Sequence, residues 1–318
     1  MAFSLWGKKE PAAPAEAAAG APAAAVAAPP APVPGVIEAK PTDDQIDCFG
    51  MTHQGKVRKT NQDHFLICSL HRQVQLHGTS LTDLESLPVG RERMAFLAMV
   101  ADGVGGGARG GEASRHAVEW LTRYAAETMQ TYYVSDATAD GFVQALSEAA
   151  YRAHASMQDL ARADPELEGM ATTLTLLLFV WPWVNVLQVG DSRYYRYENG
   201  ELTQVTRDQT MAAALVEQGV FSAEEAGRTR WANVLASSLG GKQTAPVVSR
   251  LPSNLSVVHL LCSDGLTKHV SDARIKERLA SLTSSRQACE ALIADALEGG
   301  GSDNITVVVG RVAPKPSA

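Results

Sequence analysis

A run of six apolar residues that ends at an aspartate and a cluster of glycines places the strongest constraint on how this chain can fold. Residues 96–101 are all apolar, which is typical of a buried strand, and the six glycines among positions 103–111 cannot continue that strand. We therefore expect Asp102 to lie where a central strand stops. Because glycine has no Cβ, the backbone beyond Asp102 can turn sharply and its carbonyl groups can approach a bound ion closely. The stretch indicates a site for a hard cation.

Two alternatives exist for the same stretch. Gly105, Gly107 and Gly110 have the G-x-G-x-x-G spacing of a dinucleotide-binding turn. A carboxylate directly before the glycines would repel a pyrophosphate, and the acid expected about 20 residues further on falls at Glu127, inside a helical pattern. We therefore give this alternative little weight. The other alternative is a solvated turn aspartate before a flexible segment, since Asp-Gly is a common turn dipeptide.

Composition excludes several classes of function. A net charge of −7 argues against nucleic acid or an anionic membrane as the main partner. The four cysteines are widely spaced without a C-x-x-C pair, so neither a zinc site nor a disulfide framework is indicated, and a cytoplasmic protein fits. The longest apolar run, residues 174–186, is interrupted by Pro182 and is too short to span a membrane.

The chain divides into three parts by composition. Residues 10–41 are almost entirely alanine, proline and valine, which blocks regular structure. We therefore predict a disordered tether over residues 1–43, a folded domain over residues 44–312 and a disordered tail over residues 313–318.

Alternation and helical spacing predict the elements of the folded domain. Strands are expected at 46–52, 64–68, 96–101, 169–180, 184–189, 255–262 and 305–309, with a hairpin turn at Asn199-Gly200. Helices are expected at 113–124, 142–160, 285–297 and after a cap near Ser271, and residues 69–93 are expected to form a surface excursion. His116 and His154 lie on or beside the helical faces without a second ligand at i+4, so we expect packed or surface histidines rather than metal ligands.

Four aspartates share one sequence context, because each follows the end of an apolar strand or a glycine turn. They are Asp102, Asp191, Asp264 and Asp303. If these strands share an edge, several negative charges gather within a few ångströms, which is unstable without cations. Oxygen ligands without cysteine or histidine select Mg²⁺ or Mn²⁺ over zinc. Two such ions about 4 Å apart can activate a water and clamp a phosphoryl group for in-line attack.

Six short motifs, taken together and in order, resemble those of the metal-dependent serine/threonine protein phosphatases of type 2C in their bacterial form. They are residues 58–63, 102–106, 169–173, 190–193, Asp264-Gly265 and Asp303-Asn304, and the resemblance covers roughly residues 45–312. Each motif alone is weak, whereas six in the right order are strong. The resemblance implies an α+β fold, a four-layer α-β-β-α sandwich of two antiparallel sheets flanked by helices.

The resemblance also implies a set of metal ligands. Asp102 would bridge two metal ions, and the Gly103 carbonyl would bind one of them. Asp264 and Asp303 would complete the shell of the other ion. Asp191 resembles the acid that binds a third, looser ion in bacterial members.

Two further residues receive catalytic roles from the resemblance. Arg58 would hold the substrate phosphate and Asp63 would orient waters, which makes them candidate catalytic residues together with Asp102. Gln62 stands where other relatives have a glutamate, so the second ion would depend more on waters.

Two departures from the family pattern affect proton donation and substrate choice. Val104 stands where animal relatives carry a histidine, and a water at the site could donate the proton instead. The flap region, residues 227–239, lacks the histidine-proline pair and the late arginine of bacterial members, which leaves substrate preference open.

The expected function is hydrolysis of phosphoserine and phosphothreonine in proteins at a site with two or three Mg²⁺ or Mn²⁺ ions. Expected partners are phosphorylated proteins, including a serine/threonine kinase and its substrates, and we expect a monomer. The alternative is an inactive phosphoprotein-binding module of the same fold. The presence of Asp102, Asp264 and Asp303 favours the enzyme, because inactive versions usually lose these acids.

Overall fold

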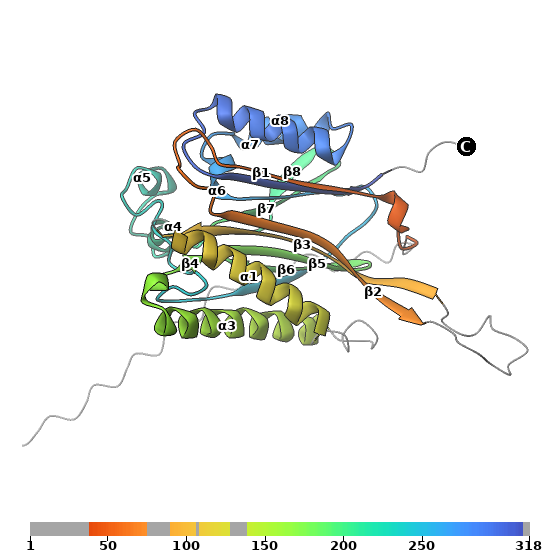
Figure 1. Ribbon diagram of the computed structural model, residues 1–318. Helices are drawn as coiled ribbons and strands as arrows, with labels where there is room; N and C mark the ends of the chain where they lie inside the picture. The colour runs from red at the N-terminus through yellow and green to blue at the C-terminus, as the bar shows by residue number, and fades with distance from the viewer. Residues whose placement is uncertain (1–37, 75–89, 106–107, 128–138, 314–318) are drawn as a thin grey trace, which may run out of the picture. The chain divides into compact units, whose positions relative to one another are not determined.

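Two antiparallel sheets packed between two pairs of helices form the folded part of the chain (Figure 1). The computed structural model describes residues 38–74, 90–105, 108–127 and 139–313, which belong to one compact unit. The predicted α-β-β-α sandwich is confirmed. Most of the tether and the tail predicted at the two ends lie outside the described residues, so the domain boundaries stay a prediction.

The first sheet has five strands, all antiparallel. In spatial order they are β1 (Ile46–His53), β11 (Ile305–Val312), β10 (Val258–Cys262), β7 (Arg193–Glu198) and β8 (Glu201–Gln204). Helices α7 (Asp272–Ala280) and α8 (Ser285–Glu298) cover its outer face (Figure 1). The turn between β7 and β8 has positive φ at Asn199 and Gly200, as the Asn-Gly pair predicts.

The second sheet is also antiparallel throughout. Its strands are β2 (Asp63–Val74), β3 (Gly90–Val104), β5 (Leu174–Val180), β6 (Trp183–Val189) and β9 (Val247–Pro252), with the short β4 (Ala171–Thr172) beside the end of β3. Helices α1 (Ala108–Glu127) and α3 (Ala139–Ala163) pack on its outer face (Figure 1). A dinucleotide-binding turn needs parallel neighbours around its helix, and the sheet that contains β3 has none among its described strands.

Short elements connect the layers. They are η1 (Asp43–Gln45), η2 (Pro165–Leu167), α4 (Met211–Glu217), α5 (Ala223–Gly227) and α6 (Asp264–Thr267). No helix within the described ranges combines the length and the apolar character that a bilayer crossing needs.

The second sheet differs from the sequence predictions at three places. The strand expected to stop at Asp102 continues to Val104, because Gly103 and Val104 pair with β4. The surface excursion predicted for residues 69–93 is wrong at both ends, since β2 runs to Val74 and β3 starts at Gly90, and residues 75–89 lie outside the described residues. Strand β9 was not predicted, because Arg250 and Pro252 interrupt its apolar pattern, and pairing with β6 forms it.

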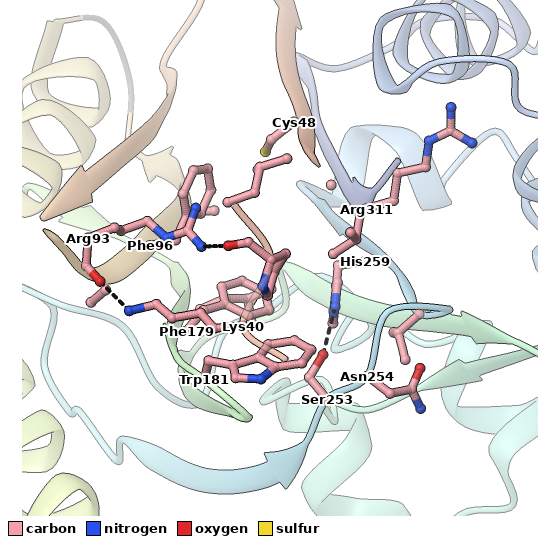
Figure 2. A pocket seen from close by; sticks show the side chains of 18 of the residues that line it. Lys40, Cys48, Arg93, Phe96, Phe179, Trp181, Ser253, Asn254, His259 and Arg311 are labelled. Carbon is pink, nitrogen blue, oxygen red and sulfur yellow. Dashed lines mark hydrogen bonds between the residues drawn. The ribbon is translucent and has the colours of Figure 1, made fainter. Parts of the chain in front are cut away.

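The interior consists of three apolar layers, two between sheets and helices and one between the sheets. The layer between the sheets contains a cavity of about 80 Å³, and Figure 2 shows Phe96, Phe179 and His259 in its wall. Phe96 precedes Asp102 by six residues along β3, which is about 20 Å of strand. The cavity is therefore remote from the strand end that carries the acid.

The backbone after β10 passes so close to β11 that only glycine fits there. A Cβ on Gly265 would lie 1.9 Å from the backbone oxygen of Asn304. We expect Gly265→Ala to lower the free energy of unfolding by about 1–3 kcal/mol or more, because the backbone of α6 or β11 must move. Urea unfolding measures this loss. Gly227→Ala is the matched control, since a Cβ there meets nothing within 4 Å; equal losses in the two variants would contradict the explanation.

Candidate metal centre

The structure brings the five predicted aspartates to one end of the sandwich. Asp63 and Asp102 are cross-strand partners in β2 and β3. Asp264 opens α6 directly after β10, Asp303 precedes β11, and Asp191 follows β6. Burial, and then the charges of Asp63, Asp264, Asp191 and Asp303, raise the pKa of Asp102 well above its usual range. Both sheets therefore contribute carboxylates to a single acidic site.

Asp63 joins the two sheets through hydroxyl groups. Its Oδ2 accepts hydrogen bonds from Ser263 Oγ and Thr306 Oγ1, both at 2.7 Å. Its Oδ1 is buried and has no hydrogen-bond partner among the residues that the structure describes. Burial raises the pKa of Asp63 to about 6, and the nearby carboxylates add to this effect while the two hydroxyl groups oppose it. A buried carboxylate oxygen without a partner is costly, so this atom is suited to binding a cation or a water.

The motif at residues 169–173 fixes the main chain of Asp102 and leaves its carboxylate available. The Asp102 amide donates to Thr173 Oγ1 at 3.0 Å. The Asp102 carbonyl accepts from Thr173 N at 2.9 Å and from Thr172 Oγ1 at 2.8 Å. Gly190 adopts a φ of 100°, and a Cβ there would meet the Thr173 side chain at 2.7 Å. The glycine before Asp191 therefore lets these two turns approach each other.

The glycine cluster after Asp102 packs the start of α1 against the site. A Cβ on Gly103 would lie 2.1 Å from the Gly110 carbonyl oxygen. Gln62 spans the same contact, because its carbonyl accepts from Gly103 N at 3.2 Å and its side-chain amide donates to the Gly105 carbonyl at 3.1 Å. The ligand role of the Gly103 carbonyl stays a prediction.

Arg58 reaches the site from the loop between β1 and β2. Its Nε lies 2.6 Å from Asp303 Oδ1, and its Nη2 donates to Asp303 Oδ2 at 2.8 Å. Asn304 shapes that loop, since its side-chain amide donates to the carbonyls of Gln54 and Thr60 and its Oδ1 accepts from Gln62 N. The Asp303-Asn304 motif thus supplies both an acid and the support for the arginine loop.

Lys268 is a second cation at the site, and sequence reasoning missed it. Its Nζ lies 2.5 Å from Asp264 Oδ2 and 2.7 Å from Asp303 Oδ2. Burial by itself would raise the pKa of Asp303, but Arg58 and Lys268 outweigh it and hold that pKa below its usual range. The i, i+4 spacing of Asp264 and Lys268 around a short helix was a signal in the sequence.

The carboxylate oxygens of the site are suitable ligands for a hard divalent cation, although they are not arranged around a single metal position. Within the described ranges, no group of three or more acids, histidines or cysteines is arranged to hold a metal ion as it stands. Lys268 and Arg58 form ion pairs with oxygen atoms of Asp264 and Asp303. Within the described part of the chain, the buried Oδ1 atoms of Asp63 and Asp264 nevertheless have no hydrogen-bond partner, and oxygen atoms are the ligands that Mg²⁺ and Mn²⁺ prefer.

The two histidines on or beside the helical faces hydrogen bond within the fold. His116 Nε2 bonds with Ser156 Oγ across α1 and α3, and His154 Nδ1 accepts from Gly240 N. The flap region at residues 227–239 attaches beside the site, since Leu239 pairs with Thr172. Because Thr172 also donates to the Asp102 carbonyl, the flap is connected to the acidic site through this one residue.

Comparisons with known proteins all lead to one family. The family model described as "Protein phosphatase 2C" matches residues 86–298. The chain is 36% identical over 219 residues to the serine/threonine protein phosphatase PstP of Mycobacterium tuberculosis, a match that covers 69% of this chain and 40% of that protein. It is 32% identical to the serine/threonine phosphatase stp of Listeria innocua, over 67% of this chain and 83% of that protein.

Solved structures agree with these sequence matches. The crystal structure of the Mycobacterium tuberculosis phosphatase PstP/Ppp superposes with a TM-score of 0.68 at 29% identity, covering 85% of this chain and 99% of that one. A structure of the PstP catalytic domain in complex with two manganese ions superposes with a TM-score of 0.65 at 29% identity, covering 85% of this chain and 99% of that one.

The raised pKa of Asp63, about 6, predicts how the stability of the metal-free protein depends on pH. The folded carboxyl keeps its proton to a higher pH than the unfolded one, so its contribution to stability is present at low pH and is lost as pH rises from about 4 through 6. The asparagine cannot ionise. We therefore expect the free energy of unfolding of Asp63→Asn, relative to that of the wild type, to increase by about 1–2 kcal/mol from pH 5 to pH 8. Urea unfolding in the presence of a chelator measures this difference, and a difference that does not change with pH would contradict it.

Proposed function

Because the chain belongs to the protein phosphatase 2C family, we propose that it hydrolyses phosphoserine and phosphothreonine in proteins with the help of Mg²⁺ or Mn²⁺. The family predicted from the six motifs is thereby confirmed. The observation that carries the proposal is the gathering of five aspartates from both sheets at one site, where buried oxygen atoms of Asp63 and Asp264 have no hydrogen-bond partner among the described residues.

The metal ligands would be the side chains of Asp102, Asp264, Asp303 and Asp191 together with the Gly103 carbonyl. When bound, the ions would supply a water nucleophile at neutral pH and offset the charge of the phosphoryl group. The two manganese ions in the structure of the mycobacterial relative's catalytic domain support this assignment.

Arg58 is suited to binding the substrate phosphate. Its side chain is 51% exposed although it contacts Asp303, so part of the guanidinium group faces solvent. The planar guanidinium donates two parallel hydrogen bonds to a phosphate, which fixes the orientation of the phosphoryl group.

Asp63 is suited to orienting a water. Ser263 and Thr306 hold its Oδ2, so the carboxylate plane is fixed and the free Oδ1 can accept a hydrogen bond from a water. Val104, which is 40% exposed, offers no proton to the leaving group. A water at the site would donate the proton instead.

A second candidate function is an inactive module that binds phosphoproteins. The observation in its favour is that Arg58 and Lys268 already neutralise Asp264 and Asp303, so a phosphate could bind these cations without hydrolysis. Under either function the partners would be phosphorylated proteins, a cognate serine/threonine kinase among them, and the monomeric state and the cytoplasmic location stay predictions.

Hydrolysis of a phosphothreonine peptide in the presence of Mn²⁺ tests the proposal. We expect turnover by the wild type and a loss of at least about 100-fold in Asp102→Asn, because a proposed metal ligand would lose its charge. Asp159→Asn is the control, since Asp159 is exposed and pairs with Arg162 on the same helix. Wild-type protein that binds the peptide without turnover would favour the binding module.

Substitution of Arg58 tests its role in substrate binding. We expect Arg58→Ala to raise KM about 10- to 100-fold at saturating metal, because hydrogen bonds between charged groups contribute about 1.5–3 kcal/mol. Arg58→Lys keeps the charge without the two-pronged geometry, so its KM should fall between the two. Steady-state kinetics measures the KM values of the wild type and the two variants. An unchanged KM in Arg58→Ala would contradict a role of Arg58 in substrate binding.

A further inference from the structure

The side chain of Lys268 lies between two of the proposed metal ligands. Its ammonium group contacts Asp264 Oδ2 at 2.5 Å and Asp303 Oδ2 at 2.7 Å. The backbone holds the lysine in place, because Lys268 N donates to the Asp264 carbonyl at 2.9 Å at the end of α6. The lysine is thus built into the same turn that presents Asp264.

Lys268 differs in this respect from the other cation of the site. Arg58 contacts Asp303 and has a half-exposed side chain, whereas the side chain of Lys268 is 29% exposed and bridges both acids. The distances from its nitrogen to the two oxygens are similar to the distances at which hard metal ions bind oxygen, about 2.0–2.6 Å. A metal ion bound to the carboxylates of Asp264 and Asp303 would therefore lie close to the ammonium group, and the two positive charges would repel each other.

We propose that Lys268 is an internal counter-ion that competes with the divalent cation for Asp264 and Asp303. This inference rests on the metal site of the proposed function and goes beyond it by naming the residue that sets how much free metal the site needs. At low metal concentration the ammonium group neutralises the two acids. When metal binds, the flexible four-carbon stem lets the ammonium group move toward solvent.

The competition has a direct consequence for affinity. A site that must first release an ammonium group binds metal more weakly than the same site without it, since both cations use the same carboxylates. Removing the charge should therefore tighten metal binding. The metal-free protein should lose stability at the same time, because Asp264 and Asp303 lose a partner.

Calorimetric titration of the full chain with Mn²⁺, after removal of bound metal, tests the inference. We expect Lys268→Met, which keeps an unbranched apolar stem, to bind Mn²⁺ at least 10-fold more tightly than the wild type. Lys268→Arg restores the charge and should return affinity toward the wild-type value. Lys276→Met is the matched control, because Lys276 pairs with Glu201 at the surface of α7, and its affinity should be unchanged.

Thermal unfolding provides a readout that does not depend on activity. Lys268→Met should unfold at a lower temperature than the wild type in chelator and at the same temperature in saturating Mn²⁺. If Lys268→Met does not fold, Lys268→Gln takes its place in both experiments.

The outcomes separate this inference from the proposed function. Equal or weaker Mn²⁺ binding by Lys268→Met, with turnover of the phosphopeptide intact in the wild type, overturns the role of Lys268 alone. Absence of Mn²⁺ binding in the wild type and in the lysine variants overturns both the metal site and the inference built on it.

Discussion

Repulsion among carboxylates drawn from both sheets is the constraint that organises this molecule. Asp63 and Asp102 come from the second sheet, and Asp264 and Asp303 flank strands of the first. Such a cluster raises the free energy of the folded state unless hydrogen bonds and cations offset it. The interactions around the site, from the Ser263 hydroxyl to the Lys268 ammonium, can be understood as that compensation.

The scaffold holds the acids at fixed positions by contacts that leave their carboxylates free. Thr172 and Thr173 bind the main chain of Asp102 rather than its side chain. The hydroxyl bonds to Asp63 cross from one sheet to the other, so they also fix how the sheets pack at this end. Glycines let the turns approach within van der Waals distance, as at Gly103 and Gly265. The same contacts therefore stabilise the sandwich and position the acids of the site.

Sequence reasoning found the features that local pattern encodes. Strand ends are visible as apolar runs that stop at an acid, and the family motifs indicated which of these acids belong together. The structure then placed all five acids at one site. The sequence could not show that β3 continues past Asp102, because pairing with β4 decides this. It also could not show that Ser263 and Thr306 support Asp63, since these contacts join residues 200 and 243 positions apart.

Lys268 was missed for a different reason, because its spacing from Asp264 was visible but its second contact was not. Asp303 lies 35 residues further along the chain and receives both Lys268 and Arg58. One carboxylate thus pairs with the proposed phosphate ligand and with the proposed internal counter-ion. A divalent cation that takes Asp303 would release both side chains from the same acid. Metal binding would then favour phosphate binding, because the side chains of Arg58 and Lys268 would lose their carboxylate partner and could pair with the phosphate instead.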